Sequence, residues 1–169
     1  MTGVFYFQYM KRKWLLSFFA MLLMIFVMRW QGQTLVTEVS PRGIIDLEFA
    51  RTTARLQQLQ QAWSLKYLQL NILLDFVFIG AYTFFFVTTA IRIKKGRDWT
   101  RFGYAFVWLA FVAGLLDVVE NILMYLAFTK SVGASSFNLI YYCALGKFNL
   151  IALLLLYFAI SLFFRPKRI

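Results

Sequence analysis

The segment AGLLDVVENILMY, residues 113–125, is apolar enough for a membrane helix, yet it carries Asp117, Glu120 and Asn121 within five positions. Each carboxyl group in hydrocarbon costs at least about 2.5 kcal/mol on insertion scales, so such groups usually face a bundle interior, a partner or a cavity. Carboxyl groups in that position are suited to general acid/base work or to proton coupling. We therefore predict catalytic or proton-binding roles for Asp117 and Glu120, with Asn121 as an orienting residue.

A second apolar segment supplies a third carboxyl group, Asp75, with Asn71 one helical turn before it. At 1.5 Å per helical residue, Asp75 lies about 10 Å from the start of its helix and Asp117 about 16 Å from the end of its own. These two helix ends face the same side of the membrane. Glu120 and Asn121 fall between those depths. The spacing predicts that three carboxyl groups from two helices meet at one level, where Asp75 is catalytic and Asn71 contributes to ligand binding.

Lys147 lies at a similar depth in the last apolar segment, about 16 Å from its start, and therefore needs a counter-ion. It projects away from Asn138 and Asn149 on the same helix, and we expect it to face the acids because an unpaired ammonium is the more costly group. Tyr142 is expected to orient a ligand. Two interpretations remain open: an ion pair that fixes the helix register, or a functional site with more acids than bases.

Four long apolar segments must position these residues. The 169-residue chain is 62% hydrophobic and 15% charged, a composition outside the soluble range. About 20 helical residues cross the hydrocarbon. We predict an all-α, single-domain membrane protein of residues 1–169, a four-helix bundle whose spans lie at about Trp14–Trp30, Leu68–Ile93, Phe102–Phe128 and Ser136–Phe164.

The net charge of +11 is concentrated rather than spread. Eleven of the eighteen basic residues lie before the first span, at the end of the second span or between it and the third, or after the last. By the positive-inside rule both termini are cytoplasmic, in the plasma membrane or in a bacterial inner membrane. The basic residues then indicate topology and contact with anionic lipid, not nucleic-acid binding.

The loop between the first two spans, residues 31–66, carries a predicted amphipathic helix over about 41–66. Ser40 can cap it, Pro41 fits its first turn, and apolar residues recur every three or four positions from Ile45 to Trp63. Glu48 can pair with Arg51 or a basic residue of the next turn. The helix either lies on the membrane surface or covers the bundle mouth and carries Glu48 inward as a ligand-binding group.

Several kinds of chemistry are not expected from this chain. It has no histidine and one cysteine, Cys143, so an internal disulfide or a histidine- or thiolate-ligated metal site is excluded. Phosphate-binding loops, dinucleotide fingerprints and nucleophile elbows are missing. We predict no metal and no cofactor.

The layout resembles the EXPERA superfamily, the four-helix membrane proteins that include emopamil-binding sterol isomerases and the sigma-2 receptor. The resemblance is carried by the loop segment SPRGIIDLEFAR, by the acid within NILLDFVFIGAYTFFF, and by the basic tail RPKRI. It implies an internal pocket for a sterol-like or cationic amphiphile, with Asp75 as the acidic position. The isomerase branch uses a histidine and the first helix of that family tends to carry an acid; this chain has no histidine and has Arg29 in its first helix.

The leading functional hypothesis is a pocket in the outer half of the bilayer that binds a lipid-like, isoprenoid-like or sterol-like molecule. If the protein is an enzyme, the acids suit an isomerase, cyclase or hydrolase that protonates an apolar substrate. One alternative is a small proton- or ion-coupled transporter acting as a homodimer. Another is a structural subunit of a larger membrane complex.

Overall fold

The computed structural model describes residues 2–95, 100–130 and 134–163. These residues are almost entirely helical. The long helices are α1 (Thr2–Gly32), α4 (Leu65–Lys95), α5 (Thr100–Thr129) and α6 (Ala134–Phe163). Between α1 and α4 lie the 3-10 turn η1 (Gln33–Leu35) and two short helices, α2 (Ile45–Glu48) and α3 (Thr53–Ala62).

The four long helices confirm the predicted membrane spans. Within the described residues, each carries an apolar stretch long enough to cross a bilayer, namely Lys11–Leu35, Leu65–Ile93, Gly103–Thr129 and Ser136–Ser161. The predicted end of the last span at Phe164 and the basic tail beyond it lie outside the described residues.

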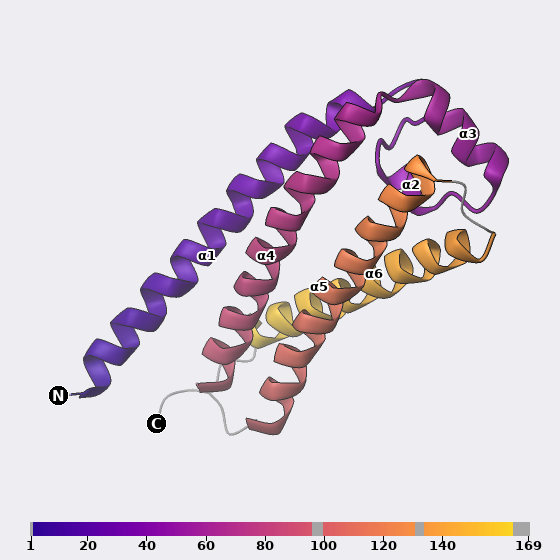
Figure 1. The fold of residues 1–169 in the computed structure, drawn as a ribbon. Helices are drawn as coiled ribbons and strands as arrows, with labels where there is room; N and C mark the ends of the chain where they lie inside the picture. Colours follow the sequence, from indigo (N-terminus) through magenta and orange to yellow (C-terminus); the bar gives the residue numbers. More distant parts are fainter. Residues whose placement is uncertain (1, 96–99, 131–133, 164–169) are drawn as a thin grey trace.

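The helices pack in chain order, α1 along α4, α4 along α5 and α5 along α6. In Figure 1, α1, α4 and α5 run side by side, and α6 crosses them. The start of α1 and the end of α6 lie at one end of the bundle, here called the terminal end, while α2 and α3 lie at the other, the loop end (Figure 1). Which end faces the cytoplasm stays a prediction from charge.

Small residues bring α4 and α5 together. The α5 residues Ala110 and Ala113 are fully buried, as the small-residue face of that helix predicts. A Cβ atom on Gly114 would lie only 2.6 Å from Oγ1 of Thr83 on α4. Because the two helices lie this close here, side chains of α4 and α5 at this depth of the bundle can contact one another.

The single loop helix predicted over 41–66 is broken into α2 and α3. Ser40 does not cap it: its Oγ donates to the carbonyl oxygen of Leu35 at 2.8 Å and accepts from the indole N–H of Trp63 at 2.9 Å. Gly43 adopts a left-handed conformation with φ of +62°, which glycine tolerates best, and α2 begins only beyond it. Thr52 is extended and caps α3 by accepting a hydrogen bond from the Arg55 amide at 3.2 Å.

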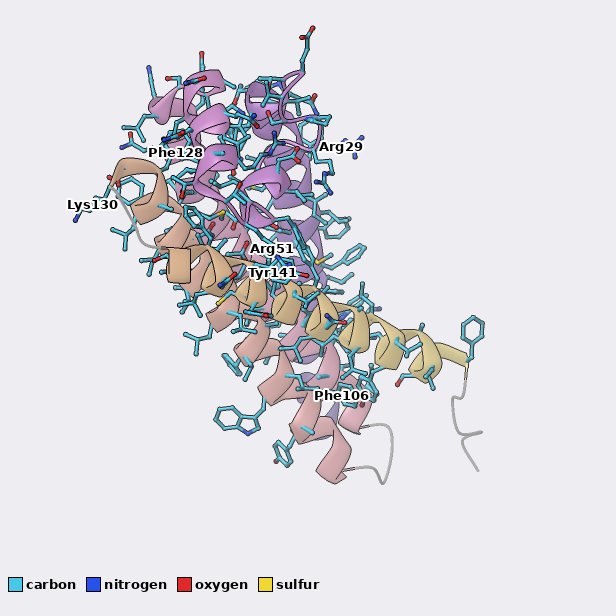
Figure 2. All side chains as sticks on the ribbon, turned by 90° about the vertical axis from the view of Figure 1, so that its right-hand side faces the viewer. Arg29, Arg51, Phe106, Phe128, Lys130 and Tyr141 are labelled. Atoms are coloured by element: carbon cyan, nitrogen blue, oxygen red, sulfur yellow. The ribbon has the colours of Figure 1, made fainter. Side chains whose placement is uncertain are left out.

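The loop charges also pair differently from the sequence expectation. Asp46, not Glu48, contacts the loop arginines: its Oδ1 lies 3.0 Å from Arg42 and 3.5 Å from Arg55. Arg51 lies over the ring of Tyr141 on α6, 3.6 Å from its centroid (Figure 2). These contacts leave Glu48 to turn away from the loop and into the bundle.

Candidate functional site

Three buried carboxyl groups converge on the ammonium of Lys147. Its Nζ lies 2.8 Å from Asp117 Oδ1, 2.9 Å from Glu120 Oε2 and 3.4 Å from Glu48 Oε1. The side chains of all four residues are at most 7% exposed. The expectation that Lys147 faces the acids is confirmed, and the group is here called the Lys147 cluster.

Glu48 reaches this cluster from the loop, so the covering interpretation of the loop is the one that the structure supports. Its neighbour Phe49 packs its ring against Tyr141 and Phe148 of α6, with centroids 5.6 and 6.3 Å away. Burial raises the pKa of the Glu48 carboxyl above its ordinary value of 4.5, while the Lys147 ammonium acts to lower it. Burial has the larger effect on this pKa.

The acids of the cluster differ in how well their oxygens are satisfied. Asp117 accepts from Lys147 at Oδ1 and from the Tyr82 hydroxyl at Oδ2, at 2.8 and 2.9 Å. Glu120 is fully buried, and neither of its oxygens has a hydrogen-bond partner among the described residues, although Oε2 is close to the ammonium. Glu48 Oε2 is likewise buried without a partner. The cluster therefore holds more acceptor capacity than its donors fill.

Asp75 stands beside the Lys147 cluster but outside its ion pairs. Its Oδ2 accepts a hydrogen bond from the Asn121 amide, and within the described residues it pairs with no lysine or arginine. Asn71, one helical turn before Asp75, donates its amide hydrogen bond to Gln31 of α1. Asp75 is thus the acid left without a cationic partner.

A cavity of about 410 Å³ lies next to these residues. One part of its wall is polar, with Asp75, Asn121 and Lys147, and the loop contributes Glu48. The remaining wall is apolar and comes largely from α1, α4 and α6, which supply Met21, Ile25, Met28, Phe85, Phe86 and Ile151. Since α1 and α6 do not pack along one another within the described residues, this volume lies between helices that diverge.

The structure brings together most of the predicted site residues. The five charged residues Glu48, Asp75, Asp117, Glu120 and Lys147 and the amides of Asn71 and Asn121 meet in this region. Tyr142 does not join them, since its side chain is 62% exposed on the outer face of α6. The helical position of Tyr142, five residues before Lys147, explains why both cannot face the same neighbours.

Two side chains that bond to residues of the candidate site, Gln31 and Tyr82, were not assigned to it from the sequence. Gln31 is 5% exposed and holds Asn71, and its amide also donates to the carbonyl oxygen of Tyr67 at 3.1 Å. Tyr82 lies seven residues after Asp75, on the same face of α4, which was the available signal. Gln31 gave no comparable signal because its partners come from a different helix.

The arrangement suits proton exchange and the binding of hydrogen-bond donors more than metal coordination. Among the described residues, no group of three or more His, Cys, Asp and Glu side chains is placed to hold a metal ion. The acids surround the Lys147 ammonium, which supplies the positive charge that a metal ion would otherwise bring.

Comparison of the chain with protein-family models, with curated proteins and with solved structures finds no match. The resemblance to the EXPERA superfamily therefore stays a prediction, and the function has to be argued from the site itself.

Proposed function

We propose that this protein binds a single membrane amphiphile in the cavity, with the apolar body of the ligand between α1, α4 and α6 and its polar end at Asp75. The observation that carries the proposal is the division of the cavity wall into an apolar part and a carboxylate-bearing part. A volume of about 410 Å³ falls within the range of ligand pockets. The many exposed apolar side chains of the spans support a position of this pocket at the depth of lipid tails.

The hydrogen-bond inventory of the polar wall favours a ligand whose polar end donates. Tyr82 already donates to Asp117, Asn121 to Asp75 and Asn71 to Gln31. Lys147 is shared among three acids. The wall thus offers acceptors and one carboxylate without a cation, so hydroxyl or amine groups fit it better than phosphate or carboxylate groups do.

Acid/base conversion of the bound molecule is the enzymatic form of this proposal. Asp75 is the carboxyl group best placed for it, because it lines the cavity and is not held by Lys147. An EXPERA-like binding protein without catalysis is the other form, and both share the same ligand site.

Transport through the bundle has less support. Beyond the polar wall, toward the terminal end, the described core is mainly apolar and aromatic, and its buried polar side chains include the neutral hydroxyls of Ser17, Thr88 and Thr89. A path for ions would need ionisable groups along that half as well.

The test is mass spectrometry of the lipids that co-purify with the wild type and with Asp75→Asn. We expect selective retention of a donor-bearing lipid by the wild type and a loss of about tenfold or more in the variant, since a charge-assisted hydrogen bond is removed. Glu38→Gln, which changes an exposed loop carboxyl group, is the matched control and should retain lipid as the wild type does. Equal, unselective retention by wild type and Asp75→Asn would remove Asp75 from the ligand site.

A further inference from the structure

The loop segment 43–51, here called the strap, closes the loop end of the cavity. Ile44 and Glu48 line the cavity wall from this segment. Leu47 and Ala50 are each only 1% exposed and belong to the apolar core at the loop end. The strap is therefore seated on the spans rather than suspended above them.

Most polar and aromatic contacts that the strap makes with the spans are with α6. Glu48 pairs with Lys147, Phe49 packs on Tyr141 and Phe148, and Arg51 covers Tyr141. On either side of α2 the backbone leaves the helical path, at Gly43 with its positive φ and at the extended Thr52. Such a short, separately anchored segment can open without unfolding the long helices.

The ion pairs inside the closed strap are unbalanced. Glu48, Asp117 and Glu120 share one ammonium, and Glu48 Oε2 and Glu120 Oε1 have no partner within the described part of the chain. Leaving all three acids ionised would bury uncompensated negative charge, which is strongly unfavourable in a low-dielectric interior. Glu48 has the longest of the three distances to Lys147 Nζ, 3.4 Å, and so gains the least from that cation.

We propose that closing of the strap over the cavity is coupled to uptake of one proton by Glu48, so that Glu48 is a neutral latch in the closed state and an ionised, hydrated carboxylate in the open state. On opening, the proton leaves the Glu48 carboxyl group for water. The inference rests on the proposed function only in one respect, that the cavity is the ligand site. The strap would then control the access of a ligand to that site.

The direction of the pH effect follows from the raised pKa of Glu48 in the closed state. The closed strap is most stable below the ordinary pKa of 4.5 and loses that stability as the pH rises through the raised value. The strap should thus open more readily as the pH rises. A strap held by an ion pair alone would show the opposite behaviour, because acid would protonate the carboxylate and break the pair. Other ionisable groups near Glu48 are Asp46 and Arg51 in the strap, Asp75 and Tyr82 on α4, Asp117 and Glu120 on α5, and Tyr141 and Lys147 on α6.

Hydrogen–deuterium exchange of the full chain in lipid nanodiscs tests this coupling. The readout is the exchange rate of the α2 amides, which donate hydrogen bonds within the strap. Each rate is divided by the intrinsic chemical exchange rate at that pH. The α3 amides, treated in the same way, serve as an internal reference. We expect α2 exchange in the wild type to rise by up to about tenfold per pH unit above about pH 5 and then to level off.

Glu48→Gln should remove this pH dependence while α3 exchange stays unchanged, and Glu38→Gln should retain the wild-type profile. Glu48→Met, which is of similar length and cannot titrate, serves if the Gln variant does not fold. A wild-type profile that is flat or that falls with rising pH would overturn the inference, as would an unchanged rise in either Glu48 variant. Because this readout needs no ligand, it fails independently of the lipid-retention experiment.

Discussion

At the loop end of the bundle, three carboxyl groups and one ammonium are buried together with the half-buried Asp75 beside them, whereas at the terminal end the described helices are joined by rings and small residues. Phe106 and Tyr157 stack with centroids 3.6 Å apart and planes within 7°, and the rings of Phe86 and Phe158 lie 5.7 Å apart. Figure 2 shows Phe106 toward the terminal end, far from the Arg51 and Tyr141 pair. Buried ion pairs thus connect the helices at the loop end, whereas ring stacking and close packing connect them at the terminal end.

The polar side chains that bond between α1 and α4 in the terminal half are neutral. Trp14 donates to Thr89 at 2.9 Å, and Ser17 shares a hydrogen bond with Thr88 at 3.0 Å. Interhelical bonds of this kind are worth about 0.6 kcal/mol on average in membranes and serve packing. The loop half instead holds charges in excess and oxygens without partners. This contrast favours a functional role for the loop half, because packing alone would not select it.

The largest effect is expected from removing the one cation of the loop half. Lys147→Met leaves the ionised acids of the cluster without a buried counter-ion and should lower the free energy of unfolding by about 3–5 kcal/mol. Thermal unfolding in detergent measures this loss, and Lys66→Met, at an exposed lysine of α4, should change it by less than about 0.5 kcal/mol. Adding Glu120→Gln to Lys147→Met should recover part of the loss. A Lys147→Met variant as stable as wild type would show that the cluster is not an ionised one.

Within the loop half, the satisfied acid should matter more than the unsatisfied one. Asp117→Asn disturbs hydrogen bonds from Tyr82 and Lys147 and should cost about 1.5–3 kcal/mol. Glu120→Gln removes a charge from a cluster with an excess of acids and keeps an oxygen that can face Lys147, so its cost should be below about 1 kcal/mol. Denaturant titration of both variants gives the order, and the reverse order would contradict the description of the cluster.

A smaller effect than that of Asp117→Asn is expected from packing between the two halves, at the close approach of α4 and α5. Gly114→Ala places a methyl group against Thr83 Oγ1 and should cost about 1 kcal/mol. Thr83→Ala should relieve that cost in the double variant. Gly80→Ala is the control, because a Cβ atom there meets nothing within 4 Å. If Gly114→Ala and Gly80→Ala behave alike in thermal unfolding, the helices are not as closely packed as described.

Sequence patterns predicted much of the site, but not its connections. Depth along each helix placed Asp75, Asp117, Glu120 and Lys147 at similar levels, and electrostatic cost turned Lys147 toward the acids. The same reasoning included Tyr142 only as a polar residue in a span, whereas it faces outward. Gln31 and the role of Tyr82 depend on which helices are neighbours, which a single helical pattern does not contain.

The sequence by itself determined that four helices are long and apolar enough to cross a membrane, and that their charged residues must face a bundle interior, a partner or a cavity, because hydrocarbon penalises every unpaired charge whatever the fold. Only the tertiary structure decided that the loop breaks after α2, that Glu48 and not Asp46 enters the bundle, and that Asp75 stays outside the ion pairs. These outcomes depend on distances of a few ångströms between segments far apart in the chain. Local propensity and periodicity carry no information about such distances.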